Sequence, residues 1–254
     1  EYDTMLRFNR AGGDSRIFVL RNLTPAALAE SMEELAKLID EAQILMLPGG
    51  FSGGDEPDGS AKFITAVLRN TRVRHAVDRL LGQRDGLALG ICNGFQALVK
   101  SGLLPGGSIT DRCAPDSATI TCNTIGRHQA KMVITRVASV KSPWFAGVIV
   151  GDLHTMPISH GEGRFTAPEA LLAALAANGQ IATQYVDAEG LPTSDVRCNP
   201  NNSALAIEGI FSADGRIFGK MGHSERVADG EALVVNIPGN KDQLIFESGV
   251  KYFR

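Results

Sequence analysis

The first hundred residues alternate between short apolar runs and segments with helical periodicity. Short apolar runs bounded by turn residues indicate buried strands, and apolar residues at spacings of three and four indicate amphipathic helices. Strands that alternate with helices predict a parallel sheet covered on both faces. We therefore predict a three-layer α/β fold with a mostly parallel central sheet between helices. The predicted elements are helices from Thr24-Pro25, around Phe63–Leu68 and over Asn93–Lys100, and strands at Ile44–Leu47 and Leu87–Ile91.

The second half of the chain is richer in strand patterns, and no linker separates it from the first half. Strands are predicted at Met132–Val137, Ile181–Val186, Ala204–Phe211 and Arg216–Met221. We therefore interpret residues 1–254 as one domain. Residues 2–10 have a helical pattern, yet no strand pattern precedes them. Because a parallel sheet is built from strand–helix–strand units, we expect that the first strand of the fold is missing.

Composition argues against several classes of function. The chain has 25 basic and 28 acidic residues without a lysine- or arginine-rich run, so we expect no nucleic-acid partner. No apolar run approaches the roughly 18 residues that would indicate a membrane span. The four cysteines form no C-x-x-C pair, which favours reduced thiols and a cytoplasmic location. Cys113, Cys122 and His128 lack the spacing of a structural zinc site, so we predict no metal site.

The segment Gly90–Gln96 (GICNGFQ) carries the strongest catalytic signal. A predicted strand runs into Cys92, glycines stand two residues before and two residues after it, and a predicted helix follows. This pattern is typical of a nucleophile elbow, in which the reactive residue lies on a sharp turn at the carboxyl edge of a sheet. The N-terminus of the helix favours thiolate over thiol. The alternative is a buried cysteine in a glycine-lined turn.

A thiolate that attacks a carbonyl carbon also needs hydrogen-bond donors for the oxyanion. The backbone N–H of Asn93 is one candidate, because it lies in the first turn of the predicted helix. We expect the second donor from the glycine-rich loop Pro48–Asp55 (PGGFSGGD), which follows a predicted strand. This loop lacks the known phosphate-binding patterns, so it does not indicate nucleotide binding.

Two histidines are followed by an acidic residue two positions later, in His160–Glu162 (HGE) and in His223–Glu225 (HSE). In extended backbone, residues i and i+2 point to the same face, so either carboxylate could orient the imidazole of a general base. Both pairs follow predicted strands, and their spacing does not choose between them. The alternative for each pair is a loop histidine near a surface acid.

The segment Gly90–Gln96 resembles the nucleophile motif of class I (triad) glutamine amidotransferases. The segments PGGFSGGD, SHGEGRF, NPNNS and GRIFGKMGHSER stand in the order found in the glutaminase domains of phosphoribosylformylglycinamidine synthases. The resemblance covers essentially the whole chain. It implies a flavodoxin-like fold, with Cys92 as nucleophile, His223 as base and Glu225 as the residue that orients this base.

The resemblance also implies the remaining site residues. They are oxyanion donors at the amides of Gly50 and Asn93, a glutamine contact at Gln96, and a pocket wall at His160 and Gly161. There is one departure from the family pattern. The family usually has prolines around the triad histidine, where this chain has Gly222 and Ser224.

The implied reaction is hydrolysis of glutamine to glutamate and ammonia through a cysteine thioester. The ammonia would supply the ATP-dependent synthesis of phosphoribosylformylglycinamidine in purine biosynthesis. The implied partner is the synthetase domain, fused or separate, and we expect this chain to be the C-terminal fragment of such a larger enzyme. ATP and magnesium are expected only in the synthetase, with no cofactor in this chain. The alternatives are another cysteine hydrolase of the same fold and a non-catalytic docking domain.

Overall fold

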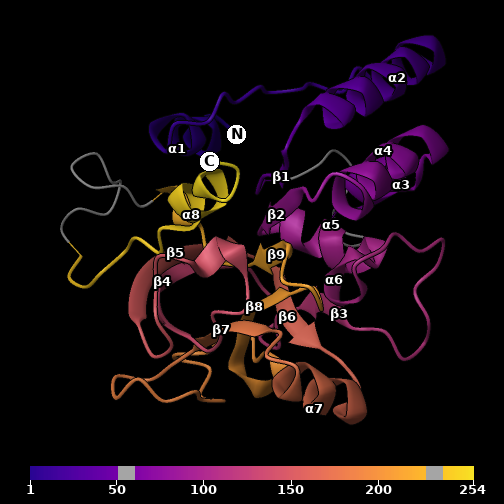
Figure 1. Ribbon diagram of the computed structural model, residues 1–254. Coiled ribbons are helices and arrows are strands. Elements are labelled where there is room, and N and C mark those ends of the chain that lie inside the picture. The colour runs from indigo at the N-terminus through magenta and orange to yellow at the C-terminus, as the bar shows by residue number, and fades with distance from the viewer. Residues whose placement is uncertain (51–60, 227–236) are drawn as a thin grey trace.

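The computed structural model describes residues 1–50, 61–226 and 237–254, and a mixed sheet crosses its centre with helices on both sides (Figure 1). The α-helices are α1 (Tyr2–Arg10), α2 (Pro25–Glu41), α3 (Lys62–Arg69), α4 (Thr71–Gly82), α5 (Asn93–Ser101), α6 (Leu103–Gly106), α7 (Glu169–Ala177) and α8 (Ile245–Lys251). The 3-10 helices are η1 (Pro143–Phe145), η2 (Ala204–Ala206) and η3 (Ser224–Arg226). Within these ranges no helix has the length and apolar character needed to cross a bilayer.

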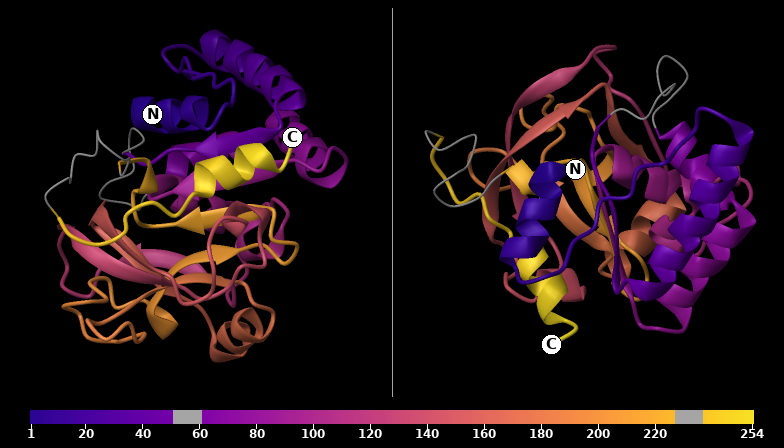
Figure 2. Two further views of the ribbon diagram at one scale, coloured as in Figure 1. Left: turned by 60° about the vertical axis from the view of Figure 1, so that its left-hand side comes forward. Right: turned by 90° about the horizontal axis from the view of Figure 1, so that it is seen from above.

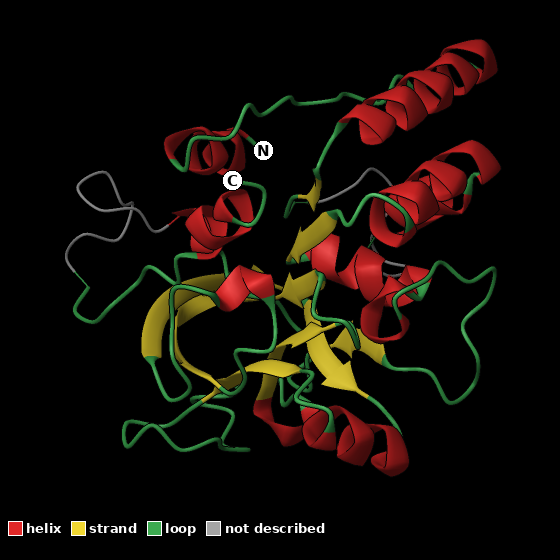
Figure 3. Cartoon of the chain, viewed as in Figure 1, coloured by secondary structure: helices red, strands yellow, loops and turns green. Residues whose placement is uncertain are grey.

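The strands form one large sheet and one small sheet (Figure 3). They are β1 (Ile44–Leu47), β2 (Leu87–Ile91), β3 (Thr119–Cys122), β4 (Gln129–Val137), β5 (Leu153–His160), β6 (Glu162–Thr166), β7 (Ile181–Tyr185), β8 (Ile207–Phe211) and β9 (Ile217–Lys220). The large sheet has the order β1-β2-β9-β8-β7-β4-β5, and β3 pairs with β6.

The parallel part of the large sheet consists of β1, β2 and β9, with Ile91 of β2 opposite Lys220 of β9. The neighbouring pairs from β9 to β5 are antiparallel. The connections explain the difference. Helices α3 and α4 return the chain from β1 to a parallel β2, whereas a short turn joins β8 to an antiparallel β9. The predicted α/β class is confirmed, and the strand-rich second half supplies the antiparallel part.

Local signals placed several elements correctly. The helix predicted from Thr24-Pro25 is α2, in which the hydroxyl of Thr24 accepts the backbone N–H of Ala27 at 3.1 Å. The predicted strand Ala204–Phe211 is wrong over its first three residues, which form η2. Leu205 and Ala206 there have φ of 50° and 55°, which no strand accommodates, so β8 begins only afterwards.

Strand β9 shows how both faces of the sheet are covered. A Cβ on Gly219 would lie 2.9 Å from Cε2 of Phe95, so α5 packs directly on this face. Phe218 points to the opposite face, where its ring centroid lies 5.0 Å from that of Phe145 in η1. Because η1 also packs against α8, the strand is buried between helices on both sides.

The first and last α-helices lie side by side (Figure 2). The rings of Phe8 in α1 and Phe246 in α8 meet edge to face at 5.0 Å between centroids. Arg7 of α1 donates to Asp242, just before α8, at 2.8 Å. Helix α1 also contacts η3. Two segments far apart in the sequence therefore meet beside the loop that follows β9.

Candidate active site

Cys92 lies at the turn between β2 and α5 with φ 51° and ψ −106°, a conformation rarely adopted by a residue with a side chain. Such strain persists only where the surrounding structure enforces it, and it is concentrated at functional sites. Here the backbone N–H of Cys92 donates to the carbonyl of Lys220 at 2.8 Å and so extends the pairing of β2 with β9. The sheet therefore holds the cysteine in the strained conformation.

The glycines on either side of Cys92 are required by close backbone approach. A Cβ on Gly90 would lie 2.7 Å from the carbonyl carbon of Gly94. A Cβ on Gly94 would lie 2.6 Å from the carbonyl carbon of Leu47 and would overlap its oxygen. The start of α5 therefore sits directly against the end of β1, and this contact places Cys92 at the carboxyl edge of the parallel strands.

His223 follows β9, and Glu225 lies two residues later in η3. Nδ1 of His223 lies 2.6 Å from Oε1 of Glu225, and both side chains are buried. Burial alone would lower the pKa of His223, but interactions with Cys92 and Glu225 outweigh it and raise the pKa to about 10. At neutral pH the ring is therefore an imidazolium held by a carboxylate.

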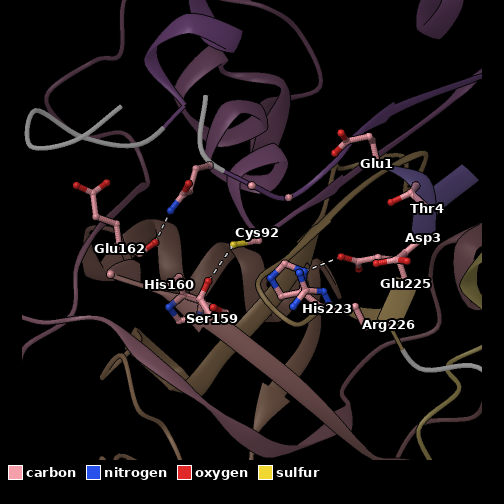
Figure 4. A pocket seen from close by; sticks show the side chains of 14 residues that line it. Glu1, Asp3, Thr4, Cys92, Ser159, His160, Glu162, His223, Glu225 and Arg226 are labelled. Carbon is pink, nitrogen blue, oxygen red and sulfur yellow. Dashed lines mark hydrogen bonds and ion pairs between the residues drawn. The ribbon is translucent and has the colours of Figure 1, made fainter. Parts of the chain in front are cut away.

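The thiol of Cys92 and the ring of His223 are neighbours in the pocket (Figure 4). A Cβ on Gly49 would lie 2.8 Å from Cε1 of His223 and 3.3 Å from Cβ of Cys92, so both residues pack around the start of the loop after β1. Sγ of Cys92 lies 3.7 Å from the carbonyl oxygen of Ser159. In the part of the chain that the structure describes, Nε2 of His223 has no hydrogen-bond partner.

The other histidine pair has a different arrangement. His160 ends β5 and is buried, with Nε2 3.4 Å from Nδ2 of Asn201. Burial, together with the positive charge of His223, lowers the pKa of His160 to about 3, so this ring is neutral at physiological pH. The side chain of Glu162 points away from this ring (Figure 4). Its carboxylate lies 3.8 Å from Nζ of Lys100, because β5 ends at His160 and a new strand begins at Glu162.

The pocket brings together most of the site residues predicted from the sequence. It is lined by Cys92, His223, Glu225, Gly50, Gln96, His160 and Gly161. Gln96, in the first turn of α5, donates through Nε2 to the carbonyl of Glu162. Gly50 has φ 130° with open space around it. Asn93 begins α5 and is buried, but it is not among the residues that line the pocket.

Sequence reasoning missed part of the pocket wall. Glu1, Asp3 and Thr4 reach the pocket from the N-terminal segment, and Ser159 and Arg226 are chain neighbours of two predicted residues. Adjacency to His160 and Glu225 could have suggested the last two, whereas no local pattern indicates the N-terminal contribution. The rest of the predicted glycine-rich loop, residues 51–55, lies outside the described residues.

The three residues weighed as metal ligands are each bonded to a different partner. Sγ of Cys113 lies 3.3 Å from the carbonyl oxygen of Lys100, and Sγ of Cys122 lies 3.8 Å from Oε1 of Glu162. Nε2 of His128 lies 3.1 Å from the hydroxyl of Ser159. Across residues 1–50, 61–226 and 237–254, no three histidine, cysteine or acidic side chains are grouped to hold a metal ion.

Comparisons with known proteins agree with one another. Residues 1–253 match the CobB/CobQ-like glutamine amidotransferase domain. Phosphoribosylformylglycinamidine synthase subunit PurQ of Salinibacter ruber is 35% identical over 210 residues, covering 83% of this chain and 79% of the relative. The subunit of the same name from Chlorobium chlorochromatii is 38% identical over 208 residues, covering 82% and 78%. The structure of PurLQS from Thermotoga maritima has the same fold, with a TM-score of 0.68 at 23% identity, covering 100% of this chain and 92% of that chain.

Proposed function

The chain belongs to the family of CobB/CobQ-like glutamine amidotransferase domains, and we propose that it hydrolyses glutamine to supply ammonia for the synthesis of phosphoribosylformylglycinamidine. The observation that carries the proposal is Cys92 on a strained elbow beside His223, whose Nδ1 is held by Glu225. The relatives named as subunits of phosphoribosylformylglycinamidine synthase, at 35% and 38% identity, support the choice of product.

The first half-reaction releases ammonia. The thiolate of Cys92 attacks the side-chain amide carbon of glutamine, a sulfur–carbon bond forms, and the amide oxygen takes the negative charge. The backbone amides of Gly50 and Asn93 stabilise this oxyanion. The imidazolium of His223 donates its proton to the amide nitrogen, the carbon–nitrogen bond breaks, and ammonia leaves. A glutamyl thioester on Cys92 remains.

The second half-reaction restores the enzyme. His223, now neutral, takes a proton from a water molecule, and the oxygen of that water attacks the thioester carbon. The carbon–sulfur bond breaks, glutamate leaves, and the thiolate of Cys92 again faces an imidazolium. Glu225 keeps the ring in one orientation through both steps because its carboxylate occupies Nδ1.

The remaining pocket residues bind the substrate and shape its surroundings. Gln96, in the first turn of α5, contacts the bound glutamine together with the segment His160–Gly161. The neutral imidazole of His160 forms a wall and does not compete as a base, since its pKa is about 3. We assign these roles from placement in the pocket and from the pattern of the family.

The ammonia passes to a synthetase, fused to this chain or separate, in which ATP and magnesium act. The likeness to the Thermotoga maritima structure named PurLQS supports an assembly of this kind. We propose that residues 1–254 form a single glutaminase domain that needs no cofactor of its own, because a thiolate and a histidine suffice for the hydrolysis. A cytoplasmic location agrees with the exposed free thiols of Cys113 and Cys122.

Replacement of the nucleophile tests the proposal. Glutamate release from glutamine should be measured for the parent, for Cys92→Ala and for Cys198→Ala, a matched control at a half-buried thiol away from the pocket. We expect Cys198→Ala to behave like the parent and Cys92→Ala to lose hydrolysis. A chloroketone analogue of glutamine should label the parent at Cys92 alone. Hydrolysis retained by Cys92→Ala, or a parent that neither hydrolyses glutamine nor reacts with the analogue, would refute the assignment.

A further inference from the structure

A buried ion pair contacts the loop that carries His223 of the proposed triad. Glu208 in β8 and Lys220 at the end of β9 have fully buried side chains, and Nζ of the lysine lies 3.8 Å from Oε1 of the glutamate. Removing two charges from water is costly, and attraction between them compensates only when further hydrogen bonds satisfy both groups. The further hydrogen bonds of Glu208 and Lys220 therefore indicate what the pair does.

Both charged groups bond to the loop that carries His223. Oε1 of Glu208 accepts the backbone N–H of Gly222, the residue before the histidine, at 2.6 Å. Nζ of Lys220 donates to the hydroxyl of Ser224, the residue after it, at 2.7 Å. His223 itself is fixed through its backbone N–H, which donates to a carbonyl of β5 at 2.9 Å. Hydrogen bonds from β8, β9 and β5 therefore hold Gly222, His223 and Ser224 in place.

Gly222 and Ser224 of this loop fit closely around the buried ion pair. A Cβ on Gly222 would lie 2.9 Å from Oε1 of Glu208 and 3.0 Å from Cγ of Met156, so a side chain at this position would displace the carboxylate or the methionine. Lys220 also donates to Oε1 of Gln243 at 2.5 Å, and Ser224 contacts the same oxygen at 3.0 Å, which ties the loop to the segment before α8.

The same contacts restrain the loop where flanking prolines are absent. A proline in place of Gly222 would have no N–H to donate to Glu208, and a proline in place of Ser224 would have no hydroxyl for Lys220. Glycine and serine leave a loop with more backbone freedom than proline does. The hydrogen bonds from the buried pair restrict that freedom by another means.

We propose that Lys220 and Glu208 are positioning residues that hold His223 against Cys92 by fixing the two loop residues on either side of the histidine. They replace with side-chain hydrogen bonds the rigidity that flanking prolines would give. The inference rests on the proposed function for its kinetic readout only, because the position of His223 relative to Cys92 can also be followed without glutamine.

The first test removes one of the hydrogen bonds to the loop and keeps the charges of Lys220 and Glu208. Ser224→Ala removes the hydroxyl that Lys220 holds and leaves the ion pair intact. We expect kcat for glutamine hydrolysis to fall about tenfold with little change in KM, since a displaced base slows chemistry more than binding. Asp214→Asn, in the turn of the same β-hairpin, is the matched control and should behave like the parent.

The second test removes the pair itself. In Lys220→Met/Glu208→Leu both charges and both hydrogen-bonding groups are lost together, so that no unpaired charge remains in the core and neither loop residue is held by these side chains. The rate at which iodoacetamide alkylates Cys92 should be measured at neutral pH for the variant and for the parent. We expect Cys92 of the variant to be alkylated several-fold more slowly than Cys92 of the parent, because the imidazolium of His223 is no longer held beside its sulfur. Thermal unfolding reports whether each variant is folded.

Parent-like kcat and an unchanged alkylation rate in a folded Lys220→Met/Glu208→Leu variant would overturn the inference. If that variant does not fold, parent-like values for Ser224→Ala would overturn it instead. A parent whose Cys92 is alkylated but that does not hydrolyse glutamine would contradict the proposed function. The difference in alkylation rate between the parent and the variants would still decide whether Lys220 and Glu208 position His223.

Discussion

Nδ1 of His223 lies 2.6 Å from Oε1 of Glu225, in a hydrogen bond buried from solvent. The two residues are only two positions apart, and the tight turn of η3 brings their side chains together just after β9 ends. A charged hydrogen bond of this length fixes the plane of the ring as well as its protonation. The chemistry proposed above depends on both.

Glu225→Gln keeps the size of the side chain and removes its charge. We expect kcat for glutamine hydrolysis to fall by about 10²- to 10³-fold, because the amide no longer stabilises the imidazolium and permits the wrong tautomer. Steady-state kinetics should show little change in KM. Glu169→Gln, at the exposed start of α7, is the control. A kcat within a few-fold of the parent would mean that another group orients the histidine.

The raised pKa of His223 makes stability depend on pH. A histidine in the unfolded chain titrates near 6.5, whereas the folded-state pKa is about 10. Between these values the folded state holds a proton that the unfolded state has released, so stability falls as pH rises. The contribution is complete below about pH 6.5 and is lost as pH approaches about 10.

Urea unfolding of the parent and of His223→Gln across this range measures the effect. We expect the free energy of unfolding of the parent to decline more steeply between neutral and alkaline pH than that of the variant. Parallel curves for the two proteins would contradict a raised pKa at His223.

We predict that His160 contributes to the binding of glutamine and does not act as the catalytic base. Because its pKa is about 3, the ring stays neutral throughout the working range and cannot supply the titrating base. We expect His160→Asn to raise KM for glutamine about tenfold with a smaller effect on kcat, as expected for a lost contact to bound substrate. The pH profile of kcat should keep its shape. If the pH dependence of kcat were lost on one side of the profile in His160→Asn, and not in His223→Asn, His160 would be the base instead.

Gly94 should not tolerate any side chain. A methyl group there would overlap the carbonyl of Leu47, and a contact with backbone leaves little room to relax. We expect Gly94→Ala to lower the free energy of unfolding by roughly 3 kcal/mol or more, at the upper end of overpacking effects. Gly82→Ala, near the end of α4 with nothing near its Cβ position, should be neutral or slightly stabilising. Thermal denaturation of the two variants compares the sites directly.

The sequence predicted those parts of the site that depend on local geometry. Two glycines around Cys92, a strand before it and a helix after it are sufficient to define the elbow, and the structure places that residue at φ 51° between β2 and α5. The cap at Thr24 is local in the same way. The resemblance to glutamine amidotransferases, carried by separated motifs, is confirmed at the level of the family.

Other features could not be predicted because they depend on contacts between distant segments. The spacing of His160 and Glu162 matches that of the triad pair, but β5 ends between them and their side chains separate. Glu208 and Lys220 lie in predicted strands, where charged residues usually mark a solvent-facing side, yet both are fully buried against each other. Only the pairing of β8 with β9 brings them together.

The packing of α1 against α8 has a consequence for the order in which the protein acquires its activity. Residues from the first turn of α1 line the pocket, and the residues that anchor this helix, Asp242 and Phe246, are synthesised long after Cys92. Contacts of such sequence separation cost loop-closure entropy and cannot form before both segments have been made. A nascent chain therefore carries its nucleophile well before the wall beside it is anchored, and the pocket is complete only once α8 has left the ribosome.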